Sequence, residues 1–384
     1  MIIDADANAS YAPSQRLQGV ILSSFESLTN PSSLHRAGQR AKALIEEARI
    51  AVRQLVGANP LDHIIFTSGA TEANNLIVHQ MRHRQGEVVS SLIEHPCILQ
   101  PLNTLRAEGC VVSLITPHGD GKITDSHVEP ALTRGTRLVS IMAANNETGV
   151  VNDLHKIVSI SRAKSPDAII HSDVAQVIGK LPFSFTESGL DAITISGHKF
   201  GALTGVGALI VREHLSIMPA IVGGPQEYKL RAGTENVLGI ISLGEAAREV
   251  VGEASARTQA MLSIRNRFEC ELLDSVPDTS INGALVDRLP NTSSVAIAGV
   301  RADDLQVALD REGILVSPGA ACSSGKPEPS HVLRAMGQSE ERVRSTIRVS
   351  FRADQTPEVA SQMVATLARI VARIRNMSYS RDRC

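Results

Sequence analysis

The sequence predicts an α/β protein with a mainly parallel, seven-stranded sheet in a large domain and a smaller α+β domain beside it. Three observations carry this prediction. The chain has 384 residues, too many for one ordinary core, and 43% of them are hydrophobic. Between about residues 33 and 247, short apolar runs alternate with amphipathic stretches, a rhythm typical of parallel strands joined by covering helices.

Seven short apolar runs supply the strands of the large domain, and longer amphipathic stretches between them supply its helices. We place the strands at residues 64–66, 88–90, 111–115, 138–142, 168–171, 192–196 and 207–211. The helices are predicted at residues 34–56, 72–83, 98–108 and 154–163.

The smaller domain follows a long helical pattern over residues 249–273. Its strands are expected near residues 294–297, 314–316 and 346–350, and a closing helix is expected over residues 357–375.

Composition limits the classes of ligand. The chain has 38 basic and 40 acidic residues, so its net charge of -2 gives no electrostatic reason to bind nucleic acid or an anionic membrane. Apolar runs stay shorter than the roughly 18 residues of a membrane span, and the N-terminus lacks a secretion signal, so we expect a cytoplasmic protein. The five cysteines show no Cys-x-x-Cys spacing, which disfavours a disulfide framework or a zinc site. The expected ligand is a small molecule, and no metal is expected.

Lys199 is the most informative residue, because it closes Ser196-Gly-His-Lys199 directly after a predicted strand. A lysine at that place can form a Schiff base with an aldehyde cofactor. Asp173 and Gln176 follow another predicted strand and add a carboxylate and an amide. Pyridoxal phosphate needs a lysine for the imine, a carboxylate for the pyridine nitrogen and donors for the phosphate. A solvated surface lysine is the alternative reading of Lys199 alone.

Residues 66–72 follow a strand and open a helix, so backbone N-H groups and the Thr71 hydroxyl could meet a phosphate there. Ser196, His198 and Thr234 could add donors, Thr234 from across a dimer interface. An ordinary helix cap is the alternative reading of residues 66–72.

Three further side chains sit where a ligand crevice is expected. His95 follows a predicted strand and could stack on a cofactor ring and shuttle protons, although a helix-entry residue is the simpler alternative. Asn146 follows the next strand and could reach the cofactor or a substrate carboxylate. Arg348 lies on a predicted strand of the smaller domain and could bind a carboxylate through two hydrogen bonds.

Cys322 differs from the other cysteines in its surroundings. It lies among glycine, proline and serine in residues 313–330, where an exposed loop is expected. A nucleophilic cysteine needs such access, whereas a structural one prefers an apolar environment. We therefore predict that Cys322 is reactive.

In order along the chain, these motifs resemble the cysteine desulfurases of class V of the fold-type I aminotransferases. The resemblance covers nearly the whole chain and includes Asp6-Ala-Asn-Ala-Ser10, Ala144-Asn-Asn-Glu-Thr-Gly149, Ser196-Gly-His-Lys199, Arg231-Ala-Gly-Thr-Glu-Asn236 and Ala321-Cys-Ser-Ser-Gly. It implies a fold-type I transferase in which residues 14–248 form the large, cofactor-binding domain. Residues 1–13 and 249–384 would form the small domain that carries the cysteine loop.

The resemblance also implies a role for each site residue. Lys199 would hold pyridoxal phosphate, Asp173 would pair with the ring nitrogen, Gln176 would bond the ring hydroxyl, and His95 would stack on the ring and manage a proton. The phosphate would be held by Ala70, Thr71, Ser196 and His198, with Thr234 from the partner subunit of a homodimer. Asn146 and Arg348 would bind the substrate carboxylate, and Cys322 would attack the sulfur.

The implied activity converts L-cysteine to L-alanine and leaves a persulfide on Cys322 for a sulfur-acceptor protein, such as an iron-sulfur scaffold. The alternatives are a pyridoxal phosphate lyase acting on cysteine or selenocysteine, and a silent scaffold of the same fold. The chain departs from the family pattern at Leu203, Thr204, Pro225 and Tyr228, which flank the cofactor site. The acceptor stays open among cluster assembly, nitrogenase maturation and the thiolation of tRNA or DNA.

Overall fold

The computed structural model describes residues 2–25, 29–319 and 329–381. Its largest sheet has seven strands in the order β2-β8-β7-β6-β5-β3-β4. These strands are β2 (His63–Thr67), β3 (Glu87–Ser91), β4 (Val112–Ile115), β5 (Thr136–Ser140), β6 (Ile169–Asp173), β7 (Ala192–Ser196) and β8 (Gly207–Val211). Only β8 runs against the others in this sheet. The predicted fold class is confirmed, and each predicted strand overlaps an observed one.

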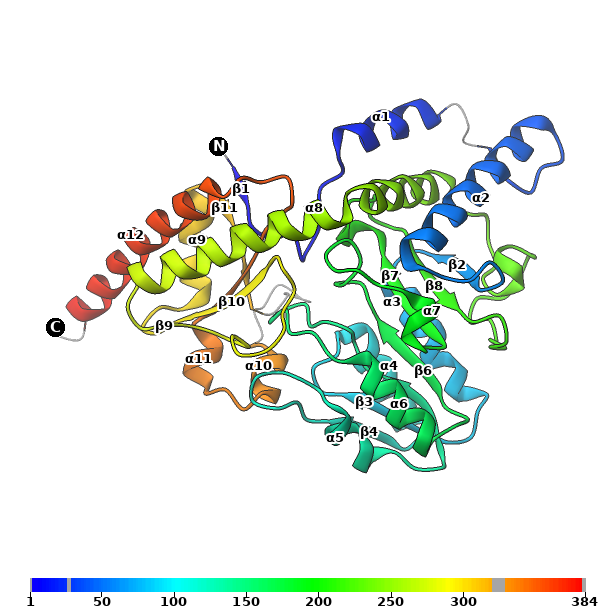
Figure 1. Ribbon diagram of the computed structural model, residues 1–384, viewed down its shortest axis with the longest axis horizontal. Helices are drawn as coiled ribbons and strands as arrows, with labels where there is room; N and C mark the ends of the chain where they lie inside the picture. Colours follow the sequence, from blue (N-terminus) through cyan, green and yellow to red (C-terminus); the bar gives the residue numbers. More distant parts are fainter. Residues whose placement is uncertain (1, 26–28, 320–328, 382–384) are drawn as a thin grey trace.

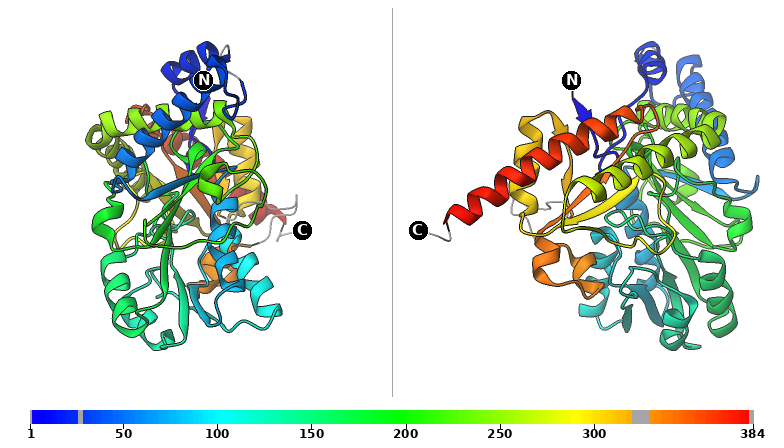
Figure 2. Two further views of the ribbon diagram at one scale, coloured as in Figure 1. Left: turned by 90° about the vertical axis from the view of Figure 1, so that its right-hand side faces the viewer. Right: turned by 60° about the vertical axis from the view of Figure 1, so that its left-hand side comes forward.

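Both faces of this sheet are covered by helices, which explains why consecutive residues of its central strands are buried on both faces. Ile64 and Phe66 of β2 join a core with α2 (Arg36–Val56), α6 (Leu154–Lys164) and α8 (Val237–Ser275). Ile65 points to the other face, into a core with α3 (Ala70–His79) and α4 (Pro96–Ala107). The strands therefore lie between two helical layers (Figures 1 and 2).

The helix α2 packs closely on α8. Its buried residues Ala41, Ile45, Ala48 and Val52 recur every three or four positions and form one apolar stripe. Gly244 of α8 faces this stripe, and a Cβ atom added there would lie only 2.6 Å from the Cα of Ala48. The absence of a side chain at Gly244 is what lets the two helices approach.

The helix α8 joins the two halves of the molecule (Figure 1). It begins at Val237, twelve residues before the predicted start, because the Asn236 side chain accepts a hydrogen bond from the backbone N-H of Gly239 and caps it there. Its first turns are buried in the core of the large sheet, whereas Ile264 and Phe268 are buried in a second core.

The second core belongs to a four-stranded antiparallel sheet in the order β12-β13-β10-β9. Its strands are β9 (Thr279–Ile281), β10 (Thr292–Ile297), β12 (Ser317–Pro318) and β13 (Thr346–Ser350), and it packs with α9 (Ala302–Arg311) and α12 (Glu358–Arg381). The strands predicted at 294–297 and 346–350 and the closing helix are confirmed. The strand predicted at 314–316 is present as β11 (Ile314–Leu315), which pairs with β1 (Ile3–Asp4) in a separate two-stranded sheet.

The remaining helices were not predicted. They are α1 (Gln15–Ser24) and the short α5 (Asp125–Val128), α7 (Phe185–Ser188), α10 (His331–Ala335) and α11 (Glu340–Arg344), together with α9. The domain boundaries at residues 14 and 248 stay a prediction. Within the described ranges, every helix is either too short or too polar to cross a bilayer.

A buried ion pair fixes the loop before α8 against the sheet. Arg49 of α2 donates two hydrogen bonds to the Glu227 carboxylate, at 2.9 and 3.0 Å, and Glu227 also accepts from the backbone N-H of Phe66 at 2.8 Å. Glu227, Tyr228 and Lys229 have φ angles of 43°, 59° and 67°, a region that non-glycine residues rarely adopt. The ion pair holds this unfavourable backbone in place.

The substitution Glu227→Gln should lower the free energy of unfolding by about 3 kcal/mol, because it removes the only buried carboxylate that contacts the Arg49 guanidinium among the described residues. The matched control is Glu46→Gln: Glu46 also contacts Arg49, but its side chain is 53% exposed, and the loss should stay below about 0.5 kcal/mol. Urea unfolding of both variants and the wild type measures the difference. Equal losses would contradict the assigned role of Glu227.

Candidate active site

The polar residues that follow the parallel strands gather around one cavity of about 440 Å³. The carboxyl ends of parallel strands share one edge of a sheet, which is why residues far apart in the sequence meet there. The cavity is lined by these predicted site residues: Ala70, Thr71, His95, Asn146, Asp173, Gln176, Ser196, His198, Lys199 and Arg348. Their roles in binding or catalysis stay predictions.

Two predicted residues are not part of this group. Thr234 is exposed and lines a neighbouring cavity, which shares only Ser68 and Gly205 with the first one. This placement agrees with a role in the site of another subunit, because Thr234 does not reach the cavity beside Lys199 of its own chain. Cys322 lies outside the described residues.

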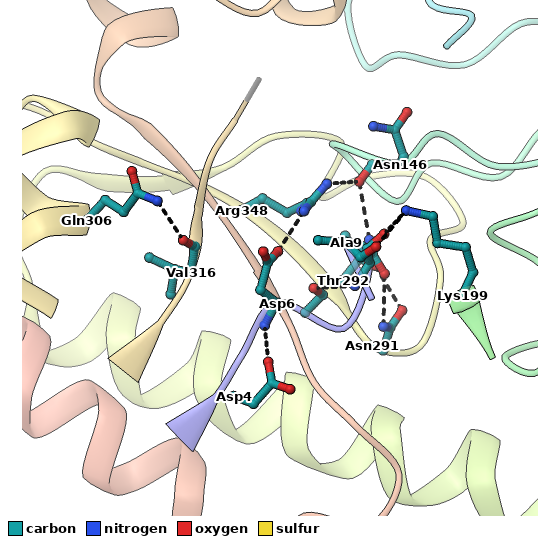
Figure 3. Close-up of polar contacts among 12 residues, drawn as sticks. Asp4, Asp6, Ala9, Asn146, Lys199, Asn291, Thr292, Gln306, Val316 and Arg348 are labelled. Atoms are coloured by element: carbon teal, nitrogen blue, oxygen red, sulfur yellow. Dashed lines mark hydrogen bonds and ion pairs between the residues drawn. The ribbon is translucent and has the colours of Figure 1, made fainter. Parts of the chain in front are cut away.

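Lys199 stands in a short 3-10 turn after β7, and its side chain is directed at the N-terminal segment (Figure 3). Its Nζ atom donates to the backbone oxygens of Asn8, at 2.8 Å, and Ala9, at 2.9 Å. Burial and the positive charge of Arg348 lower the pKa of Lys199 to about 8, although Asp6 and Asp173 oppose this. Roughly a tenth of Lys199 is then a free, nucleophilic amine at pH 7, far more than for an ordinary lysine.

Asp173 ends β6 and is buried at the cavity wall. Its carboxylate accepts from the backbone N-H of Ala175 at 2.9 Å and from the side-chain amide of Asn74 at 2.8 Å. The same Asn74 nitrogen lies 3.0 Å from the Sγ atom of Cys97. Asn74 thus holds the Asp173 carboxylate, and Cys97, which also lines the cavity, contacts Asn74. Sequence reasoning assigned no role in the site to either residue.

His95 is the N-cap of α4, and its Nδ1 atom accepts from the backbone N-H of Cys97 at 3.2 Å. An accepting Nδ1 places the proton of the neutral ring on Nε2. Burial lowers the pKa of His95, which favours this neutral form. The ring can therefore offer a donor at Nε2 while its orientation is fixed through Nδ1.

The N-terminus of α3 forms another wall of the cavity through Gly69, Ala70 and Thr71. No side chain caps this helix end, so the N-H groups of its first turn stay available for an anion. The backbone packs closely here, since a Cβ atom added at Gly207 would lie 2.8 Å from the Cα of Gly69. Ser196 and His198 stand across the same cavity, 3.2 Å apart at Oγ and Nδ1.

Arg348 enters the cavity from β13 of the smaller sheet. Its side chain is 3% exposed and donates to Asp6 Oδ1 at 2.6 Å and to the backbone oxygen of Asn146 at 3.1 Å (Figure 3). Its Nε atom is buried and has no hydrogen-bond partner. A buried guanidinium with an unused donor is suited to bind a carboxylate in the cavity.

Sequence reasoning missed the contribution of Asn8. This residue was quoted only within the motif Asp6-Ala-Asn-Ala-Ser10, without a role. It is fully buried, lines the cavity, and its backbone oxygen accepts from both Lys199 and Gln176. The available signal was an asparagine between two small alanines, which fits a close approach of the backbone to a site.

The comparisons with known proteins agree with this arrangement. The family model "Aminotransferase class-V" matches residues 7–362. The chain therefore belongs to the class-V aminotransferase family, whose members use pyridoxal phosphate.

Its relatives define the branch of the family. A cysteine desulfurase from Trichormus azollae is 37% identical over 352 residues, covering 91% of this chain and 87% of that protein. The structure of a NifS-like protein from Rickettsia africae ESF-5 has a TM-score of 0.88 at 34% identity and covers 96% of this chain and 99% of its own. The structure titled "SspA in complex with cysteine" has a TM-score of 0.80 at 30% identity. The match covers 92% of this chain and 99% of that chain. Within its family, the chain lies among the cysteine desulfurases.

A buried carboxyl beside the site gives a test of its electrostatics. Glu94 is fully buried and accepts from Ser91 Oγ at 2.7 Å and the backbone N-H of Met142 at 2.9 Å, while its second oxygen has no partner. Burial raises the pKa of Glu94 from 4.5 to about 8. The folded chain therefore binds this proton more tightly than the unfolded chain does, and the resulting stability is lost as the pH rises through about 8.

The substitution Glu94→Gln, which mimics the neutral acid, should flatten the fall of stability between pH 5 and pH 8. The expected difference from the wild type is on the order of 1.4 kcal/mol per pH unit, the slope of one proton. Urea unfolding at several pH values measures it, with Glu47→Gln as the control because Glu47 is exposed. If the unfolding free energy of Glu94→Gln fell with pH as steeply as that of the wild type, Glu94 would be ionised in the folded protein.

Proposed function

We propose that this chain is a pyridoxal phosphate-dependent cysteine desulfurase that converts L-cysteine to L-alanine and carries the sulfur as a persulfide on Cys322. The observation that supports it most is the meeting of Lys199, Asp173 and Arg348 at one cavity, although they come from β6, β7 and β13. Membership of the cysteine desulfurases supports the choice of substrate.

The residues of the cavity fit the cofactor in their chemistry. Lys199 would hold it covalently, the buried Asp173 carboxylate would face its ring nitrogen, and Gln176 would bond its ring hydroxyl. The uncapped α3 terminus at Ala70 and Thr71, with Ser196 and His198, would bind the phosphate, and Thr234 of the partner subunit would complete it. When bound, pyridoxal phosphate supplies an electron-accepting ring.

The side chains of this chain then handle the substrate and its protons. Arg348, with its unused Nε, and Asn146 bind the substrate carboxylate and orient the Cα-H bond toward Lys199. Lys199, whose pKa is lowered to about 8, removes the α proton as a general base and returns it later. His95, held through Nδ1, has its Nε2 proton available for the reacting groups.

Sulfur transfer is assigned to Cys322. Its thiolate attacks the sulfur of the substrate, and a sulfur-sulfur bond forms as the carbon-sulfur bond breaks. The electron pair of the broken bond stays with the carbon, which takes up a proton and becomes the methyl group of alanine. The reaction therefore needs no external oxidant. A thiol or a sulfur-acceptor protein removes the sulfur, and we place that acceptor among iron-sulfur scaffold proteins.

The quaternary structure and compartment are part of the same proposal. A homodimer is supported by Thr234, which lies away from the cavity of its own chain. A cytoplasmic location rests on the sequence alone.

The test of the activity is product analysis after incubation of the cofactor-loaded protein with L-cysteine and a thiol reductant. Alanine and sulfide should form in equal amounts, and Cys322→Ala should lose at least about a hundredfold in rate, since no nucleophile remains. Cys270→Ala is the matched control, because Cys270 is exposed and far from this chemistry. Pyruvate with sulfide, or full activity of Cys322→Ala, would instead identify a lyase.

The subunit arrangement is tested by mixing two inactive variants, Lys199→Ala and Thr234→Ala, under conditions that exchange subunits. In a mixed dimer, the site with an intact Lys199 receives an intact Thr234 from the other subunit, so activity should reappear. A mixture that stays as inactive as its components would place Thr234 in the site of its own chain. Sedimentation of the mixture confirms that dimers are present.

A further inference from the structure

Lys180 is a buried amine that the proposed chemistry does not use. It is 3% exposed and lies in the turns after β6. Its Nζ atom donates to the side-chain oxygen of Asn8 at 2.7 Å and to Oε1 of Gln176. Both acceptors are uncharged amides, and no ion pair joins Lys180 to a carboxylate in residues 2–25, 29–319 and 329–381. A buried amine without a counter-charge is costly, which points to a specific use.

The contact with Lys180 determines the orientation of the Gln176 amide. A lysine ammonium has donors only, so the oxygen of Gln176, and not its nitrogen, faces Lys180. The amide nitrogen then faces away and donates one proton to the backbone oxygen of Asn8 at 3.1 Å. Its second proton remains for a group bound in the cavity that Gln176 lines. Gln176 is therefore held as a hydrogen-bond donor.

We propose that Lys180 is a positioning residue that fixes Gln176 as a donor to the ring oxygen of bound pyridoxal phosphate. This inference rests on the proposed function. Two contacts hold the Gln176 amide, Lys180 at its oxygen and the backbone oxygen of Asn8 at its nitrogen. Without Lys180, only the Asn8 contact opposes a rotation that would present the amide oxygen to the ring oxygen, which would be repulsive. A fixed donor stabilises the ring oxygen as an anion, and so favours loss of the proton shared between that oxygen and the Lys199 nitrogen.

The orientation of Gln176 does not require a charged Lys180. Burial lowers the pKa of Lys180 well below its ordinary value, and the positive charges of Lys199 and Arg348 add to this. A neutral amine can also accept through its lone pair, but the Gln176 nitrogen donates to the backbone oxygen of Asn8, so the two protons of the amine still meet two oxygen acceptors. The other titratable or charged groups that face Lys199 are Asp6, His95, Cys97, Asp173, His198 and Arg348, and all of them stay unchanged in the test.

The experiment is a pH titration of the visible absorption of the bound cofactor in Lys180→Met. The midpoint of the titration should rise by about one pH unit relative to the wild type, the size of one lost hydrogen bond to a charged group. Lys156→Met is the matched control, because Lys156 is an exposed lysine and should leave the midpoint unchanged. A wild-type midpoint in Lys180→Met would overturn the proposal.

A second pair of variants tests whether Lys180 acts through Gln176. In a Gln176→Leu background no amide remains to be oriented, so adding Lys180→Met should shift the midpoint no further. An additional shift of the same size in that background would overturn the proposal, because Lys180 would then act directly on Lys199 by its charge.

The variant Lys180→Gln covers the case in which Lys180→Met fails to fold. It keeps a polar side chain in the buried position, but an amide can accept as well as donate, so Gln176 loses its fixed orientation and the midpoint should rise. An unchanged midpoint in Lys180→Gln would contradict the proposed role of Lys180 as a positioning residue. The readout is absorption and does not depend on turnover. If the protein bound the cofactor but produced no alanine, the proposed function would be wrong, and the titration would still test the role of Lys180.

Discussion

The geometry of the site depends on the hydrogen bonds of one buried residue, Asn8. Its backbone oxygen accepts from Lys199 and Gln176, and its side-chain oxygen accepts from Lys180 and Asn291. Its side-chain nitrogen donates to Asn146 and Thr292, and its backbone N-H donates to Ser350. The partners lie after β5, β6 and β7 of the large sheet and on or beside β10 and β13 of the smaller one. Asn8 thus connects both sheets at the point where the chemistry is proposed.

The charges around Asn8 explain why the site needs such a fixed frame. Lys180 and Lys199 donate to Asn8, and the positive charge of Arg348 lowers the pKa of both lysines, whereas Asp6 and Asp173 act to raise the pKa of Lys199. In a low-dielectric cavity, cations that are not neutralised repel each other and must be held by neutral oxygens. The amide and backbone oxygens of Asn8 and Gln176 provide that support. An anionic cofactor and a substrate carboxylate complement the remaining positive charge.

The strands of the large sheet could be predicted from the sequence because they contain short apolar runs. The residues of the cavity could be predicted because polar residues directly follow those runs. Lys199, Asp173 and His95 could be found from such positions. Asn74, Cys97 and Lys180 could not, because each lies in a stretch that looks like an ordinary helix or turn, and each has a contact partner distant in the sequence, such as Asn8 for Lys180. The start of α8 was misplaced because Gly239 and Gly244 weaken the helical pattern, whereas the structure favours glycine at both places: Gly244 packs against Ala48 of α2, and Gly239 lies against the capping side chain of Asn236.

The pairing of the first strand has a consequence for the order in which the protein is made. Residues 3–8 are made before their partners, because β1 pairs with β11, and Asn8 bonds to Asn291, Thr292 and Ser350. The large sheet can form from residues 63–211 while these partners are still unsynthesised. The strand β1 cannot pair before residues 314–315 are made, and the backbone N-H of Asn8 waits for Ser350. Completion of the cavity therefore follows the synthesis of β13, the strand that supplies Arg348.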